Sequence, residues 1–258
     1  MAGNCRYSPV APLPLLRQLQ ERDLLGNYLL FLAHDVLEHP QEYSDLVANL
    51  GNDEHAYPKD KFIIMDNGVI ELGTPLSAPE IQDAAHIVYA DTPIMPDFLG
   101  SFEETQKRVI VASTNIDSSW MRVPQGSNLR EVVSCIDWLH SYLPVADGEP
   151  EYWGVPRWIT NQMGSRIPIV QYINHICANP KIHLLGMSTN MQDDLRCCTL
   201  PDVIGIDSAN PLTLGIAGIN ITVGHSYGHP ERGNYWDATK LWDQSANNVA
   251  WMHDAVGI

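Results

Sequence analysis

Acidic and amide side chains follow several short apolar runs of this sequence, at positions where a strand would give way to a loop. Asp66 follows KFIIM, Asp97 follows IMP, and Asp207 follows VIGI. Gln125 takes the same place in RVPQG. Carboxylates that converge in one pocket can act as a nucleophile, a general acid or base, a metal ligand, or an acceptor for the amino groups of a ligand. The chemistry therefore depends on whether the fold brings these side chains together.

Apolar runs rich in Ile, Val, Leu and Met recur along the chain, and segments with helical spacing separate them. We expect strands at 28–33, 61–65, 86–89, 120–123, 152–155, 182–185 and 203–206, with 219–223 as an eighth candidate. The clearest helical segments are 102–112, 129–143, 166–178 and 191–197. Buried strands that alternate with helices are typical of parallel α/β folds. Seven or eight such units predict a (β/α)8 barrel of TIM type, with a doubly wound sheet as the alternative.

The predicted barrel occupies the whole chain as one domain. Its 258 residues, of which 45% are hydrophobic, are enough for one substantial core. We expect residues 1–27 to be an extended, Pro-rich lead-in and residues 212–258 to be a closing segment, with a closing helix over 235–252. In a barrel the loops after the strands build the active site. The four polar side chains at the strand ends are therefore expected in one pocket.

The charge of the chain limits how it can bind a nucleic acid. Its formal net charge is −16, from 15 Lys and Arg against 31 Asp and Glu, which repels a polyanion over much of the surface. Basic residues do recur in the middle of the sequence: Lys107, Arg108, Arg122, Arg130, Arg157 and Arg166. We expect a local patch that includes Arg130, Arg157 and Arg166. The alternative is that these are scattered solubilising charges.

Cysteine usage favours reduced thiols rather than disulfides or a thiolate metal site. The five cysteines are an odd number and have no CxxC spacing. His225 and His229 form a pair in a Gly-rich loop, but two histidines alone make a poor metal site. No apolar run approaches a membrane span, and the N-terminus lacks the features of a signal peptide. We therefore expect a cytoplasmic protein that needs no metal and no membrane.

Several motifs occur in the order found in one enzyme family. They are Asp66-Asn67-Gly68 after a strand, Asp97 after the next, Val123-Pro124-Gln125-Gly126, Gly154-Val155, HLLGMSTNMQDDL from His183 to Leu195, and Asp207 followed by Pro211. In this order the chain resembles the queuine tRNA-ribosyltransferases, also called tRNA-guanine transglycosylases. It is most similar to their smaller relatives that modify DNA in phages and bacteria, which would place it in a host cytoplasm if it is encoded by a phage.

The resemblance implies exchange of guanine in DNA for a 7-deazaguanine base such as preQ0. It assigns Asp207 as the nucleophile that forms a covalent glycosyl ester and Asp66 as the general acid and base. Asp97 would accept hydrogen bonds from the N1–H and the amino group of guanine. The other base-binding residues that it implies are Asn67, Gln125, Gly126, Gly154, Val155 and Met187. No cofactor is expected, and a homodimer is compatible with this interpretation.

Departures from the family pattern narrow the expected substrate. The tRNA enzymes carry a zinc site of three cysteines and a histidine after the nucleophile, and this chain has no cysteine beyond Cys198. The absence favours the zinc-free branch, and DNA over tRNA. A tRNA enzyme remains the close alternative. Two further alternatives are an enzyme that hydrolyses or exchanges the bases of free nucleosides or nucleotides, and a non-catalytic subunit of a transglycosylase.

Each motif also has a purely structural interpretation. Asp66-Asn67-Gly68 is a common turn sequence, and Asp207-Ser208-Ala209-Asn210 could be a turn after a strand. Asp97 could cap the helix that we expect to begin near Ser101, and Gln125 could bond to the loop backbone. The positions of these side chains distinguish the two interpretations.

Overall fold

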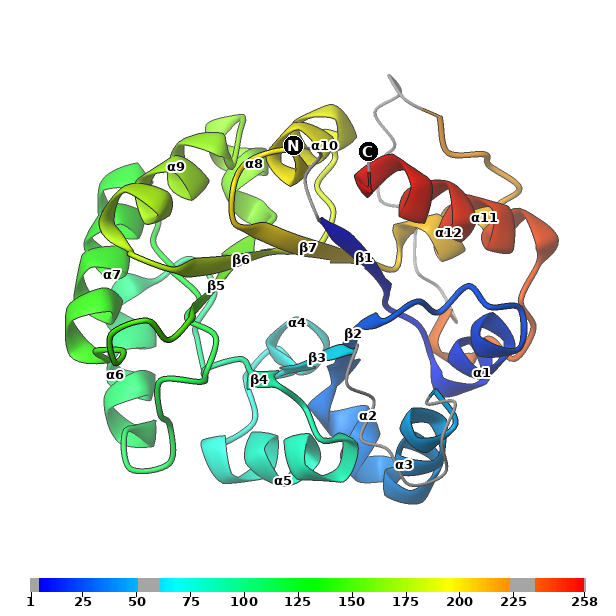
Figure 1. Cartoon of the computed structure of the whole chain (residues 1–258), viewed down its shortest axis with the longest axis horizontal. Helices are drawn as coiled ribbons and strands as arrows, with labels where there is room; N and C mark the ends of the chain where they lie inside the picture. Colours follow the sequence, from blue (N-terminus) through cyan, green and yellow to red (C-terminus); the bar gives the residue numbers. More distant parts are fainter. Residues whose placement is uncertain (1–4, 51–60, 223–234, 258) are drawn as a thin grey trace.

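The strands of this chain are short and parallel, and helices surround them (Figure 1). Our computed structural model describes residues 5–50, 61–222 and 235–257. The strands are β1 (Arg6–Pro9), β2 (Tyr28–Leu32), β3 (Phe62–Asp66), β4 (Thr92–Pro93), β5 (Glu151–Pro156), β6 (Pro180–Leu185) and β7 (Val203–Ser208). They form two parallel sheets, with the orders β1-β7-β6-β5 and β2-β3-β4. The architecture is therefore mixed α/β with parallel strands.

The two sheets are linked at both of their edges. On one side, segment 120–123 lies between them, with one parallel bridge from Met121 to Ile94 and another from Arg122 to Trp153 in β5. On the other side, the backbone N–H of Leu30 in β2 donates to Ser8 Oγ in β1 at 2.7 Å. The strands predicted at 28–33, 61–65, 152–155, 182–185 and 203–206 are confirmed, whereas 120–123 makes only the isolated bridges.

Helices follow most of the strands and lie outside them. Those in the described residues are α1 (Leu13–Glu21), α2 (Ala33–Glu38), α3 (Pro40–Ala48), α4 (Val69–Leu72), α5 (Ala78–Val88), α6 (Phe102–Ala112), α7 (Leu129–Tyr142), α8 (Trp158–Met163), α9 (Ile167–Ile176), α10 (Met191–Cys198), α11 (Asn210–Ile216) and α12 (Asp243–Val256). A short 3-10 helix spans Tyr235–Asp237. The four predicted helical segments correspond to α6, α7, α9 and α10. Within the described residues, none of the helices has the length and apolar character needed to cross a bilayer.

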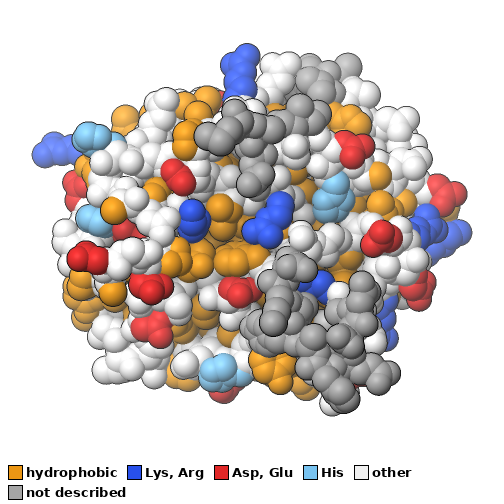
Figure 2. All heavy atoms as spheres, in the orientation of Figure 1, with side chains coloured by type: hydrophobic (Ala, Val, Ile, Leu, Met, Phe, Trp, Pro, Cys, Tyr) orange, Lys and Arg blue, Asp and Glu red, His pale blue; other side chains and the backbone are white. Residues whose placement is uncertain are grey.

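Side chains of the strands and the inner helix faces form one continuous apolar core. All five residues of β2 are buried, as expected for a strand covered on both sides. Polar caps define several helix starts: Ser101 Oγ accepts from Glu104 N in α6, and Asn128 Oδ1 accepts from Glu131 N in α7. In the face that Figure 2 shows, hydrophobic side chains gather near the centre and charged side chains lie beside and around them.

The strand predicted at 86–89 is wrong. These residues form the last turn of α5 and its C-cap, Tyr89, which has a φ of 53°. A capping box between Ser77 and Glu80 starts this helix, and its apolar residues recur on one buried face, with Ile81, Ala84 and Val88 among them. The run HIVY belongs to that face. The strand in this part of the chain is β4, which begins three residues after Tyr89 and is only two residues long.

The N-terminal residues are also more ordered than an extended lead-in. Arg6–Pro9 form β1, which pairs with β7, and α1 follows with four buried leucines. By contrast, residues 219–222 form no strand, and residue 223 lies outside the described residues. The N-terminus therefore supplies the strand that was expected near the C-terminus. The closing helix is present as α12, which packs on α11, but it begins at Asp243 rather than at residue 235, where the structure has the 3-10 helix.

Candidate active site

A cavity of about 500 Å³ lies at the carboxyl ends of the strands. Its lining includes residues at or just after the ends of six strand positions: Leu32, Asp66, Ile94, Pro156, Leu185 and Asp207. Asp97, Gln125 and Asn67 also line it, so the structure brings together the four polar side chains at the predicted strand ends. The remaining wall is largely apolar and includes Trp158. A cavity of this size and composition is suited to a small ligand with a few polar groups.

The turn after β3 fixes the direction of Asp66. Its Oδ1 accepts a hydrogen bond from Gly68 N at 2.7 Å, and Asn67 Oδ1 accepts one from Val69 N at 3.0 Å. Gly68 adopts a φ of 74°, a conformation that side chains with a Cβ rarely take. The turn interpretation of this motif is therefore correct, and the turn also holds Asp66 at the cavity wall.

The surroundings of Asp66 favour its neutral form. Burial is the largest cause that raises the pKa of this carboxyl well above its ordinary value. The negative charges of Glu71, Asp207 and Asp97 raise the pKa further, while the bond from Gly68 N opposes them. A carboxyl that keeps its proton to higher pH can serve as a general acid.

Two side-chain amides hold Asp97, which is only 2% exposed. Asn67 Nδ2 donates to Asp97 Oδ1 at 2.6 Å and to the Met95 carbonyl oxygen, also at 2.6 Å. Gln125 Nε2 donates to Asp97 Oδ2 at 2.5 Å. Burial raises the pKa of Asp97 to about 6, although the hydrogen bonds from Asn67 and Gln125 and the nearby Arg108 lower it. Asp97 is thus a fixed acceptor that is ionised at neutral pH.

Gln125 has little freedom to turn its amide. Its Oε1 accepts from Trp158 Nε1 at 2.9 Å and from Gly100 N at 3.0 Å. These two donors force the oxygen away from Asp97 and the nitrogen towards it. Gln125 therefore orients the acceptor Asp97, in addition to lining the cavity.

A hydrogen-bonded chain from the core orients Asp207, which is 8% exposed. Asp207 Oδ1 accepts from His183 Nε2 and from Gly186 N, both at 2.9 Å. His183 Nδ1 lies 2.8 Å from the Tyr28 hydroxyl, and burial raises the pKa of Tyr28, so that its O–H donates to this nitrogen. Among the described residues, Asp207 Oδ2 has no hydrogen-bond partner. One oxygen is thus held while the other is left for the cavity.

The remaining predicted base-binding residues do not line this cavity. A Cβ on Gly126 would lie 2.7 Å from Glu131 Cβ, so this glycine permits close packing at the start of α7. Gly154 packs in the same way against Leu185 and Met121. Val155 and Met187 belong to the apolar core. Their predicted contact with a base is not supported by their positions.

The predicted basic patch is not one surface. Arg166 is completely buried: its Nη2 donates to Asp194 Oδ1 at 2.5 Å and its Nη1 to the carbonyl oxygens of Val155 and Gly186. The prediction that it contacts DNA is wrong, because its guanidinium holds the ends of β5 and β6. Arg157 lines the cavity, and Arg130 is exposed at the start of α7.

Other structural alternatives are resolved by neighbouring serines. Ser101 caps α6 with its own hydroxyl, so Asp97 is not the cap. Ser208 Oγ accepts from Asn210 N at 2.9 Å and forms the turn after β7. The two aspartates are consequently not needed for these local structures.

Sequence reasoning missed the residues that support the acids. His183 and Tyr28 lie inside apolar strand runs, and a polar residue within such a run was the signal that could have marked them. Glu71 follows the end of β3 by a few residues, on α4. All five cysteines are free and buried, and the pair His225 and His229 lies outside the described residues.

A comparison of the chain with models of known protein families finds no match. A comparison with curated protein sequences finds none either. A functional assignment rests on the cavity and on the motifs that line it.

Proposed function

We propose that this chain is a guanine transglycosylase that exchanges guanine in DNA for a 7-deazaguanine base. The main observation in support of this function is that Asp66, Asp97 and Asp207 line one cavity and are held by three different sets of partners. Paired acids in distinct environments are suited to distinct roles in one reaction. The motif order that resembles the transglycosylases assigns the same three residues.

The proposal includes a closed (β/α)8 barrel. Segment 120–123 takes the fifth strand position, between β4 and β5, and the bond from Leu30 N to Ser8 Oγ joins β2 to β1. With β1 to β7 this makes eight parallel positions, each with its carboxyl end towards the cavity. Active sites of such barrels lie at this end.

In the first half of the reaction, Asp207 attacks C1′ of the target nucleotide with its Oδ2. A bond forms between Oδ2 and C1′ while the glycosidic bond to guanine breaks, and Asp66 gives its proton to the departing base. The bonds from His183 and Gly186 keep the other oxygen, Oδ1, in place. The product is free guanine and a glycosyl ester on Asp207.

In the second half, the incoming 7-deazaguanine replaces Asp207. Asp66, now ionised, takes the proton from the attacking ring nitrogen, which forms a bond to C1′ as the ester breaks. Asp207 leaves as a carboxylate and Asp66 is protonated again. The cycle requires neither an oxidant nor a net loss of water.

Asp97 accounts for the choice of base. An ionised carboxylate accepts from the two adjacent donors of guanine, N1–H and the amino group, and 7-deazaguanines keep both. Adenine lacks this pair and would leave a buried acceptor unsatisfied, which costs about 1–3 kcal/mol. The amides of Asn67 and Gln125 keep Asp97 in this orientation.

A second candidate is base exchange or hydrolysis on a free nucleoside. Arg157 is the one Lys or Arg among the described residues that line the cavity, and the net charge of the chain is −16. Both features suit a small substrate better than a polyanion. The tRNA reaction is a third alternative that uses the same three acids.

Incubation of the purified protein with radiolabelled guanine and duplex DNA, tRNA or guanosine tests these alternatives. We expect label in DNA, and a covalent adduct on a denaturing gel when a slow-leaving base analogue is present. Asp207→Asn should abolish both, because an amide is a poor nucleophile. Asp83→Asn, a change to an exposed acid on α5, is the matched control and should leave both unchanged.

Other results of this experiment would favour a different substrate or a different nucleophile. Label in tRNA alone or guanosine alone would favour those substrates. An adduct that persists in Asp207→Asn would move the nucleophile to Asp66. Failure of all three substrates to take up label would contradict base exchange.

A further inference from the structure

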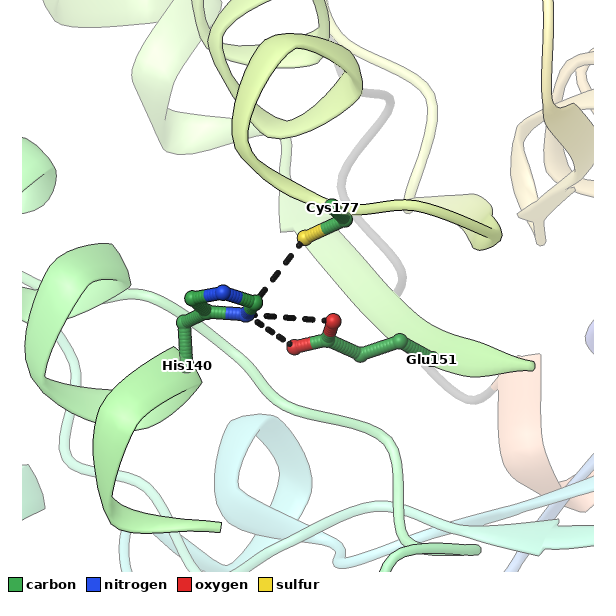
Figure 3. A group of neighbouring side chains, drawn as sticks. All are labelled: His140, Glu151 and Cys177. Carbon is green, nitrogen blue, oxygen red and sulfur yellow. Dashed lines mark hydrogen bonds and ion pairs between the residues drawn. The ribbon is translucent and has the colours of Figure 1, made fainter. Parts of the chain in front are cut away.

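Three side chains of types that can ligate a metal converge at the start of β5 (Figure 3). The opposite end of this strand, at Pro156, lines the cavity. His140 lies in the last turn of α7, Glu151 is the first residue of β5, and Cys177 is the C-cap of α9. Neither the predicted reaction nor the motifs in the sequence use any of them. Their convergence therefore requires a separate explanation.

The ligand atoms are spaced as they are around a tetrahedral zinc ion. His140 Nδ1 lies 3.0 Å from Glu151 Oε1 and 3.8 Å from Cys177 Sγ, and all three ligand atoms are within 4.8 Å of one another. Usual zinc–ligand bond lengths in a tetrahedron give separations of about 3.4 Å for N and O and about 3.6 Å for N and S. Movements of a few tenths of an ångström would suffice to bind the ion.

The site is buried on one side and open on the other. Glu151 and Cys177 are buried, whereas the side chain of His140 is 40% exposed. An ion can therefore enter beside the imidazole, and water can supply a fourth ligand. With Nδ1 as the ligand atom, the proton of the imidazole lies on Nε2.

The indole of Trp153 is a second observation that favours a ligand here. Its Nε1 is buried and has no hydrogen-bond partner among the described residues. The nearest acceptor is the sulfur of Cys177, and the approach of the indole N–H lowers the pKa of that thiol. A metal-bound thiolate would give this donor an acceptor, and such supporting bonds are usual around metal ligands.

Two features oppose a metal-bound thiolate: burial, together with Glu151, raises the pKa of the Cys177 thiol to about 12, and Arg122 already supplies a positive charge beside Glu151. Arg122 Nε lies 3.5 Å from Glu151 Oε1, and Arg122 Nη2 donates to the Leu143 carbonyl oxygen. Without a metal, Glu151 is ion-paired with Arg122 and lies within hydrogen-bond distance of His140 Nδ1. The two explanations differ in whether Cys177 takes part as a thiolate.

We propose that His140, Glu151 and Cys177 bind one Zn²⁺ ion, with water as the fourth ligand. A nitrogen, oxygen and sulfur donor set suits this borderline-soft cation. Binding releases the thiol proton of Cys177 to solvent and ties the ends of α7 and α9 to the start of β5. This departs from the expectation that the chain needs no metal, and it is independent of the proposed reaction.

Titration of the chelator-treated full chain with Zn²⁺, and separately with Co²⁺, tests the site. We expect one Zn²⁺ per chain, a rise in melting temperature on binding, and a thiolate-to-cobalt absorption band. Cys177→Ser should remove the band, and His140→Gln should weaken Zn²⁺ binding more than about tenfold, the lower end of what loss of even a supporting residue costs a metal site. His86→Gln, at an exposed histidine on α5, is the matched control.

Three results would overturn the proposal. They are an absence of stoichiometric binding, a cobalt band that persists in Cys177→Ser, and equal Zn²⁺ affinity in wild type and His140→Gln. The last two would place the ion at other residues. The melting temperature without metal shows whether each variant is folded, so a loss of binding can be assigned to the missing ligand.

Discussion

Asp97 and Asp207 are both acidic, but their partners suit them to different tasks. Asp97 is bonded at both oxygens by amides that are themselves fixed, which makes it a rigid acceptor. Asp207 is bonded at one oxygen only, which leaves the second oxygen available to react. In the proposed reaction, the base-binding acid and the nucleophile would thus differ in the number of carboxylate oxygens that the protein itself occupies.

The pKa of Asp97 predicts how base binding depends on pH. Burial raises this pKa to about 6, so the carboxylate is present above pH 6 and is lost as the pH falls. Protonation would convert an acceptor into a donor that faces the donors of guanine. We expect the affinity for guanine, measured by calorimetry, to fall about tenfold per pH unit below pH 6.

Two variants check the assignment of that profile. Asp97→Asn should bind guanine weakly at every pH, since its amide places a donor in the site. Asp66→Asn should keep the wild-type profile, because Asp66 moves protons and does not read the base. If the pH profile shifted in Asp66→Asn instead, the titrating group would be Asp66 and not Asp97.

His183 should affect reaction more than binding. His183→Leu removes the donor to Asp207 and leaves the Tyr28 hydroxyl buried without its partner, at a cost of about 1–3 kcal/mol in the free energy of unfolding. We expect kcat to fall about tenfold or more, with guanine affinity unchanged. His183→Gln, which can still donate to Asp207, should retain more activity. Urea unfolding and initial rates measure these effects, and equal kcat in the Leu and Gln variants would refute the positioning role.

The acids could be predicted from sequence, but their supporting residues could not. Each acid follows an apolar run, and a parallel fold places such positions at one edge. The role of His183 depends on β6 and β7 being neighbours, which a local pattern does not specify. The same holds for Arg166, whose long side chain is equally compatible with a surface or with the buried ends of β5 and β6.

At the scale of elements, the closing helix α12 is positioned by close contact with α11. A Cβ on Gly215 would lie 2.3 Å from Ser245 Cα and 2.4 Å from Ser245 N, which are backbone atoms that a rotamer change cannot move. Gly215→Ala should therefore separate the helices and lower the free energy of unfolding by about 1–3 kcal/mol or more.

The matched control for Gly215→Ala is Gly257, at the C-terminal end of α12. A Cβ on Gly257 would meet only His253 O, at 3.3 Å, and its φ of −86° suits alanine. Gly257→Ala should change the melting temperature little. Equal effects of the two substitutions would mean that the contact between α11 and α12 is not tight in solution.

Elements with a strong local pattern were predicted correctly, whereas β1 and β4, which have no such pattern and depend on pairing with distant strands, were not. The helices α6 and α7 have apolar periodicity and polar N-caps, so local information is sufficient. β1 is a strand because it pairs with β7, some two hundred residues later. Its sequence, RYSP, has no apolar alternation. The short β4 was not predicted either, because the neighbouring helix α5 carries the stronger apolar pattern.

At the scale of the whole molecule, charge limits the strength of polymer binding. The net charge of −16 repels DNA at long range, so if DNA is the substrate, as we propose, its affinity must come from a few local cationic contacts. Of the three arginines predicted to contact DNA, Arg157 lines the cavity and Arg130 is exposed at the start of α7. Arg166 is excluded as a DNA contact because its buried guanidinium donates to the carbonyl oxygens of Val155 and Gly186, at the ends of β5 and β6.

Reversal of these two charges should weaken DNA binding in a salt-dependent way. In Arg130→Glu/Arg157→Glu, the slope of log affinity against log salt should decrease by about 0.9 for each phosphate contact that is lost. Arg22→Glu, at an exposed arginine paired with Asp243, changes the net charge without altering the cavity and serves as the control. Fluorescence anisotropy of labelled duplex DNA at several salt concentrations gives the slopes. Equal slopes in wild type and the double variant would exclude this patch, whereas guanosine exchange without DNA binding would make the free nucleoside the substrate.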